Sequence, residues 1–216
     1  MIELVAGTAA PQTSASAVYV IDDDRDIRSS LVLLLRASGL AARAFGRGED
    51  FLDELDFLQP GCVLLDLRMP EMSGLELLAE LRRRDCHWPV VVITGHGDIS
   101  LAVRAVKLGA IEFLEKPFGE DELKTALGEA FRRLEEAALK SKHSRAARQA
   151  LDRLTTRERQ VFEGVVRGQT SKEIASNLSL SPRTVESYRL TMMRKLKAQS
   201  MYDLLAIATH GVPAQA

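Results

Sequence analysis

The 216-residue chain has few of the features that mark secreted, membrane-spanning or metal-rich proteins. Its two cysteines, Cys62 and Cys86, fit no metal-binding spacing, and so low a number favours a reducing compartment over a disulfide framework. No apolar run approaches the roughly 18–20 residues of a membrane helix. The first basic residue is Arg25, which disfavours a secretory signal. These absences favour a soluble cytoplasmic protein with no membrane partner.

The chain also has almost no net charge, which taken alone argues against nucleic acid as a partner. The formal charge of −1 is unevenly distributed, however: residues 1–135 carry −8, residues 136–150 carry +3, and residues 151–216 carry +4. An acidic N-terminal part and a basic C-terminal part indicate different partners for the two ends of the chain. The length likewise favours two domains over one.

Apolar runs typical of strands alternate with helical patterns through the acidic part of the chain. The runs cover 18–21, 40–45, 62–65, 90–93 and 111–115, and helical patterns follow at 26–38, 49–58, 74–84, 100–108 and 120–133. This alternation predicts an α/β fold in which helices cover both faces of a five-stranded parallel sheet. The ligand site of such a sheet lies at the carboxyl ends of its strands.

The residues that follow the strands are therefore the functional candidates. Asp22 and Asp23 follow the first strand, Asp66 the third, Thr94 the fourth and Lys116 the fifth. Converging carboxylates repel one another unless a cation intervenes, and their hard oxygens suit Mg²⁺. A carboxylate beside Mg²⁺ and opposite a lysine can attack a phosphoryl group. An isolated aspartate pair is more often a solvated turn, but here suitable residues follow four strands.

Four motifs at these strand ends resemble the receiver domain of two-component response regulators. They are VIDDD (20–24), LDLRMPEMSG (65–74), VITGHGD (92–98) and FLEKPF (113–118). The resemblance covers about residues 17–135 and implies a CheY-like (flavodoxin-like) fold. It also implies that Asp66 is the phosphoacceptor.

The resemblance assigns further roles around the phosphoacceptor. The positions that it implies for Mg²⁺ are the carboxylates of Asp22, Asp23 and Asp66 and the backbone carbonyl of Arg68. The positions that it implies for the switch and for the phosphoryl group are Thr94, Gly95, Phe113, Lys116 and Pro117. Among these, Gly95 leaves room for the phosphoryl group, and Pro117 matches the position of a cis peptide bond.

The basic part of the chain has a different pattern. Residues 136–150 lack a full apolar stripe and predict an interdomain linker, for which a helix is favoured over an extended chain. After them every predicted segment is helical, at 156–167, 171–178, 182–196 and 200–209. Two helices joined by a short turn, the second opening with Ser-Pro, predict a helix-turn-helix whose second helix enters the major groove. From charge alone, a helical interaction domain with a solvated face is equally consistent.

The segment LTTRERQVFEGVVRGQTSKEIASNLSLSPRTVESYRLTMMRKL (154–196) closely resembles the four-helix DNA-binding domain of the NarL/FixJ (LuxR-type) transcription regulators. The predicted domain covers 151–213. The resemblance implies binding to a two-fold pair of DNA half-sites, with the last helix at a dimer interface. Some relatives carry lysine at the positions of Glu186 and Leu190, so no operator sequence is carried over.

Two groups of candidate DNA contacts follow. Those that the resemblance implies for base edges are Glu186, Ser187, Arg189 and Leu190. Those that charge and position indicate for phosphates are Lys172, Arg183, Thr184, Arg194, Lys195 and Lys197.

The two resemblances together predict a response regulator that is not an enzyme. A sensor histidine kinase would phosphorylate Asp66, and the phosphoryl group would control homodimerisation and operator binding to regulate transcription, with RNA polymerase as a further partner. The competing class is an aspartate-nucleophile phosphatase. It is disfavoured because no second aspartate lies two residues after Asp66 and no cap domain encloses a substrate. A weaker alternative is a phosphorylation-independent DNA binder.

Overall fold

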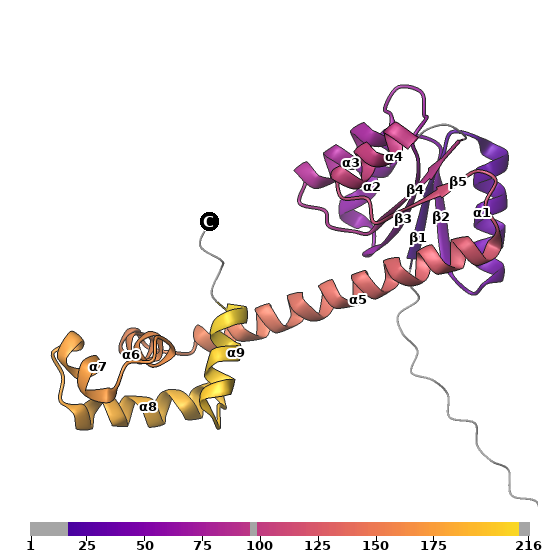
Figure 1. The fold of residues 1–216 in the computed structure, drawn as a ribbon. Coiled ribbons are helices and arrows are strands. Elements are labelled where there is room, and N and C mark those ends of the chain that lie inside the picture. Colours follow the sequence, from indigo (N-terminus) through magenta and orange to yellow (C-terminus); the bar gives the residue numbers. More distant parts are fainter. Residues whose placement is uncertain (1–16, 96–98, 212–216) are drawn as a thin grey trace, which may run out of the picture. The chain divides into compact units, whose positions relative to one another are not determined.

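The computed structural model describes residues 17–95 and 99–211 (Figure 1). Contacts between residues divide the chain into two compact units, with the boundary between Glu135 and Glu136. The first unit is α/β and the second is all helical. The predicted end of the second domain, at residue 213, lies outside the described residues.

The first unit is built on a single parallel sheet. Its strands are β1 (Ala17–Ile21), β2 (Ala41–Phe45), β3 (Gly61–Asp66), β4 (Val90–Thr94) and β5 (Glu112–Glu115). They pair in the order β2-β1-β3-β4-β5, and every pair is parallel. The predicted α/β class with five parallel strands is therefore confirmed.

Helices cover both faces of this sheet (Figure 1). They are α1 (Arg25–Ala37), α2 (Gly48–Glu54) with the short 3₁₀ helix η1 (Leu55–Phe57), α3 (Gly74–Arg83), α4 (Ile99–Lys107) and α5 (Glu120–Leu151). Apolar residues of α1 and α5 pack on one face, and those of α2, α3 and α4 pack on the other. Strand β3 is buried along its whole length because both of its faces are covered, which explains its continuous apolar run.

Helix α5 is longer than the sequence pattern indicates. The predicted helix ends near Arg133 and a helical linker is predicted after it, whereas the structure joins the two into one continuous helix that ends at Leu151. Alanine, lysine, arginine and glutamine favour a helix there, and no proline or glycine interrupts residues 129–151. Apolar periodicity failed to indicate this stretch because a solvated helix has no continuous apolar stripe. None of the helices in the described ranges is long and apolar enough to cross a membrane.

Four further helices form the core of the second unit. They are α6 (Thr156–Val166), α7 (Ser171–Leu178), α8 (Pro182–Leu196) and α9 (Met201–Gly211). Side-chain oxygens cap three of them: Thr155 and Thr170 form capping boxes at α6 and α7, and Ser181 caps α8. The apolar stripe Val185, Met192 and Leu196 is buried in the core, as its spacing predicts.

Because each unit has its own core, we expect core truncations to act locally. Leu64→Ala removes a fully buried side chain from β3 and should destabilise the first unit by about 2–5 kcal/mol. Trp88 is the only tryptophan and stacks on Tyr19 in that unit, so its fluorescence during urea unfolding reports the change. Ile174→Ala, in the second core, is the matched control. An equal shift of the Trp88 transition by both variants would contradict two separate cores.

Candidate functional site

Two buried carboxylates and one lysine meet at the carboxyl edge of the sheet. Asp22 follows β1 and is 1% exposed, and Asp66 ends β3 and is 5% exposed. The Lys116 ammonium, which follows β5, lies 2.8 Å from Asp22 Oδ2 and 2.6 Å from Asp66 Oδ1. The lysine therefore joins two aspartates that are 44 residues apart in the chain.

Backbone N–H groups hold the other oxygens of both carboxylates. The Arg68 N–H donates to Asp66 Oδ2 at 2.7 Å, and the Asp24 N–H donates to Asp22 Oδ1 at 2.8 Å. In addition, the Arg28 guanidinium of α1 donates to the backbone carbonyl of Asp22. The strand ends and their following turns thus fix the direction of each carboxylate before any ligand arrives.

Burial and charge act in opposite directions on the protonation of this site. Burial raises the pKa of Asp66, and the hydrogen bond and charge of Lys116 oppose that rise without cancelling it. Burial lowers the pKa of Lys116, but its hydrogen bonds to Asp22 and Asp66 outweigh this and leave the pKa above its ordinary value. The lysine is thus held in its charged form beside the carboxylates.

The ends of β4 and β5 border this cluster. Thr94 is buried at the end of β4, and its hydroxyl lies 3.4 Å from the carbonyl oxygen of Gly95. The Lys116 N–H donates to the Thr94 carbonyl at 2.8 Å, which anchors the lysine backbone to β4. The Lys116–Pro117 peptide bond is cis.

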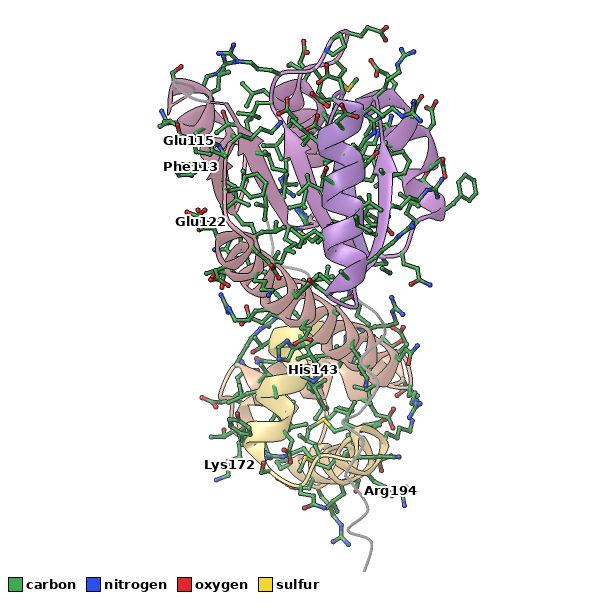
Figure 2. The ribbon with its side chains drawn as sticks, turned by 90° about the vertical axis from the view of Figure 1, so that its right-hand side faces the viewer. Phe113, Glu115, Glu122, His143, Lys172 and Arg194 are labelled. Carbon is green, nitrogen blue, oxygen red and sulfur yellow. The ribbon has the colours of Figure 1, made fainter. Side chains whose placement is uncertain are left out.

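Phe113 lies apart from the buried cluster. Its side chain is 48% exposed and projects from β5 near Glu115 (Figure 2). A surface groove of about 730 Å³ runs beside it, with Lys116 and Glu122 also in its lining. Strand pairing puts Phe113 opposite Val92 and Glu115 opposite Thr94, so Phe113 and Thr94 share one face of the sheet.

The remaining candidates for Mg²⁺ are arranged less tightly. Asp23 is exposed beside buried Asp22, and in the described ranges no three His, Cys, Asp or Glu side chains are grouped to hold a metal ion. The donor set of Asp22, Asp23, Asp66 and the Arg68 carbonyl nevertheless consists of hard oxygen atoms, the class that Mg²⁺ prefers. The chemistry of these donors therefore fits the ion.

Gly74, which the sequence pattern does not mark as a site residue, packs closely against the backbone of the phosphoacceptor candidate Asp66. A Cβ atom at this position would lie 2.2 Å from the Asp66 carbonyl oxygen and 2.8 Å from Leu67 Cα. The Gly74 N–H donates to the Leu67 carbonyl at 3.1 Å. Only glycine lets the start of α3 approach this turn so closely. The signal in the sequence was a glycine directly after the Ser73 helix cap.

The second unit presents helices α7 and α8 as a helix-turn-helix. The chain turns at Ser179, whose φ of 56° is left-handed, and α8 begins after Ser181 with Pro182 in its first turn. The buried stripe of α8 faces the core, so the opposite side of the helix is directed outward. Four candidate DNA contacts are exposed on α7 or α8 or at the end of α8: Lys172, Arg183, Arg194 and Lys197.

The base-contact candidates all lie on α8, but only three of them are on its outward side. Glu186, Ser187 and Leu190 are exposed, whereas Arg189 is half-buried. The Ser171 hydroxyl of α7 donates to Glu186 Oε1 and accepts a hydrogen bond from Arg189 at 3.0 Å. The sequence pattern does not indicate this cross-helix contact, because Ser171 lies 15 residues before Glu186.

Lys195 has a partner within the protein. Its ammonium lies 2.6 Å from Glu158 Oε2, and Glu158 is 4% exposed. The same Glu158 oxygen accepts the Thr155 N–H in the capping box of α6. The hydrogen bond from Lys195, together with that of Thr155, holds the pKa of Glu158 below its ordinary value. This pair ties the start of α6 to the end of α8.

Comparison with known proteins agrees with both halves of this description. Residues 18–128 match the response regulator receiver domain family, and residues 152–208 match the bacterial regulatory proteins of the luxR family. The chain is 42% identical over 196 residues to the transcriptional regulatory protein FixJ of Bradyrhizobium diazoefficiens, which covers 91% of this chain and 96% of that one. It is 46% identical over 191 residues to FixJ of Azorhizobium caulinodans, covering 88% and 90%.

A solved structure shows the same similarity over nearly the whole chain. The response regulator StyR has a TM-score of 0.78 and 38% identity, covering 91% of this chain and 99% of that one. A receiver domain followed by a LuxR-type DNA-binding domain defines a two-component regulator of transcription. The chain belongs to the NarL/FixJ family of response regulators.

The Glu158–Lys195 pair should make the stability of the second unit depend on pH. Because the pKa of Glu158 is lowered on folding, its contribution is complete above the ordinary pKa of 4.5 and is lost as the pH falls. We expect Glu158→Gln to cost about 1–3 kcal/mol at pH 7 and clearly less at pH 4. Urea unfolding followed by circular dichroism measures both values.

Glu163→Gln is the matched control for this pair, because Glu163 is exposed on the same helix. It should change the free energy of unfolding by less than about 0.5 kcal/mol at either pH. An equal cost of Glu158→Gln at pH 7 and pH 4 would show that the carboxylate charge contributes nothing.

Proposed function

We propose that phosphorylation of Asp66 by a sensor histidine kinase switches this regulator between weak and strong binding to operator DNA. The observation that carries the proposal is the contact between Lys116 and Asp66, 2.6 Å long at a buried strand end. A structural salt bridge would not need a second carboxylate, Asp22, on the same ammonium. The surplus of negative charge supports a site for a transferable group that requires cations.

The transfer itself needs a nucleophile and a neutralised phosphoryl group. An oxygen of the Asp66 carboxylate attacks the phosphorus of phosphohistidine, the P–N bond breaks, and its electron pair leaves with the imidazole nitrogen. Lys116 neutralises charge on the transferred oxygens, and Gly95 leaves room for them. Mg²⁺, held by Asp22, Asp23, Asp66 and the Arg68 carbonyl, would supply further positive charge to the same oxygens.

The phosphoryl group then biases a conformational equilibrium. It brings roughly −2 of charge and three acceptor oxygens into a buried site. The Thr94 hydroxyl donates to one of these oxygens, and Phe113 turns inward into the space that Thr94 vacates. The exposed position of Phe113, on the same sheet face as Thr94, supports this coupling. Phosphorylation shifts the populations of two states and does not create a new one.

The outputs of the switch are dimerisation and DNA binding. Val103 and Val106 of α4 are about half exposed and, with Phe113, offer an apolar surface for a second copy of the first unit. Met201, Tyr202 and Leu205 on α9 offer a second exposed apolar surface. Two copies would place two α8 helices in successive major grooves of a two-fold operator. RNA polymerase is a proposed further partner at the promoter.

The proposed DNA surface combines the two groups of candidates on α7 and α8. Glu186, Ser187, Arg189 and Leu190 face base edges. The phosphate contacts are Lys172, Arg183, Thr184, Arg194, Lys195 and Lys197, of which Lys195 acts from its position beside Glu158. The lysines and arginines among these contacts provide the affinity and its dependence on salt.

Asp66→Asn should abolish the response of DNA binding to phosphorylation. With a small-molecule phosphodonor and Mg²⁺, we expect the wild-type Kd for operator DNA to fall by about 5- to 150-fold. The variant should show no change, because an amide cannot accept the phosphoryl group. Footprinting titrations with and without phosphodonor measure both responses.

Asp85→Asn is the matched control, because Asp85 is an exposed aspartate at the end of α3 and asparagine tolerates its φ of 57°. It should respond like the wild type. A full response by folded Asp66→Asn would exclude Asp66 as the switch residue. Steady turnover of small phosphate esters by the wild type would instead favour the phosphatase alternative.

A further inference from the structure

We propose that Glu186 and Arg189, held together by Ser171, read a cytosine and a guanine as one unit in each operator half-site. This inference rests on the proposed function, because it takes α8 to be the helix in the major groove. It adds the class of DNA sequence that the protein selects, which depends on three particular side chains.

The unit is built across two helices. Ser171 is the first residue of α7, and its hydroxyl both donates to Glu186 Oε1 and accepts from Arg189. Glu186 and Arg189 lie three residues apart on α8, so their side chains are neighbours on one side of that helix. One hydroxyl thus fixes both a carboxylate and a guanidinium.

A carboxylate on this surface needs an explanation, because DNA phosphates repel it. A carboxylate only accepts hydrogen bonds, and the N4 amino group of cytosine is a donor in the major groove. The Ser171 contact uses Oε1 and leaves Oε2 for a base. The positive end of the α7 dipole, next to Ser171, stabilises the negative charge of the Glu186 carboxylate at this place.

The guanidinium complements the carboxylate. Arg189 contacts Ser171 through one terminal nitrogen, which leaves its other N–H groups for the O6 and N7 acceptors of guanine. The next residue, Leu190, is 73% exposed and uncharged. Leu190 therefore offers no charge to a phosphate at this point of α8, and the polar groups of Glu186 and Arg189 favour a C and a G.

Preorganisation makes the pair selective. Free glutamate and arginine side chains lose rotamer freedom when they contact a base, and the Ser171 hydroxyl removes part of that cost in advance. The alternative role of these three residues is a structural clasp, that is, a contact that only holds α7 against α8. The two roles differ in one observable: a structural clasp changes affinity for all sequences equally, whereas a reading unit changes the ranking of bases.

The test uses the full-length protein with a small-molecule phosphodonor and Mg²⁺. Repeated selection from a pool of randomised duplex DNA gives the preferred site, and Kd is then measured for every single base-pair change in one half-site. We expect the affinity of the wild type to fall by about 5- to 150-fold when one particular cytosine, or one particular guanine, is replaced by another base. Glu186→Gln should lose the preference for cytosine at that position. It should instead prefer adenine, because an amide can both donate to and accept from the major-groove edge of that base.

Ser171→Ala keeps both charged groups and removes only the hydroxyl. It should weaken discrimination at the cytosine and at the guanine together. Lys172→Gln is the control on the same helix: it should lower affinity for all duplexes equally, and reduce the salt slope by about 1. Thermal melting of each variant checks that it is folded.

Two results would overturn the proposal. If Glu186→Gln and Ser171→Ala keep the wild-type ranking of bases at every position, the three residues form only a structural clasp, while the proposed function stands. If phosphorylated wild type selects no preferred duplex at all, the proposed function fails and this inference fails with it.

Discussion

The bridge of Lys116 between Asp22 and Asp66 is the interaction on which the rest of the first unit depends. Two aspartates that are each at least 95% buried would destabilise the fold by several kcal/mol if they had no counterion. Lys116 compensates both with one ammonium, at 2.8 Å and 2.6 Å. Because these residues lie at the carboxyl ends of β1, β3 and β5, the bridge forms only when those three strands are assembled in one sheet.

The features around the bridge serve to position it. The Arg68 and Asp24 N–H groups direct the carboxylates, and the Thr94 carbonyl anchors the backbone of Lys116. Gly74 lets α3 start against the Asp66 carbonyl. The arrangement leaves one net negative charge at a desolvated strand edge, which suits the arrival of a cation and a phosphoryl group.

Much of this could be predicted from the sequence, because local patterns determine it. The alternation of apolar runs and helical spacing indicates the parallel sheet, and parallel strands bring Asp22, Asp66 and Lys116 to one edge. The extension of α5 through residues 136–150 could not be predicted by apolar spacing, since a solvated helix has no stripe. The contacts of Ser171 with Glu186 and of Glu158 with Lys195 depend on how helices pack, which no short-range pattern records.

The central claim is that Asp66 itself accepts the phosphoryl group, and one measurement tests it most directly. The full-length protein is treated with a phosphodonor and Mg²⁺, its intact mass is determined, and the acyl phosphate is trapped by borohydride reduction before peptide mapping. We predict one phosphoryl group per chain and reduction at Asp66 alone. A protein that gains no phosphoryl group, or one modified at another residue, would contradict the account.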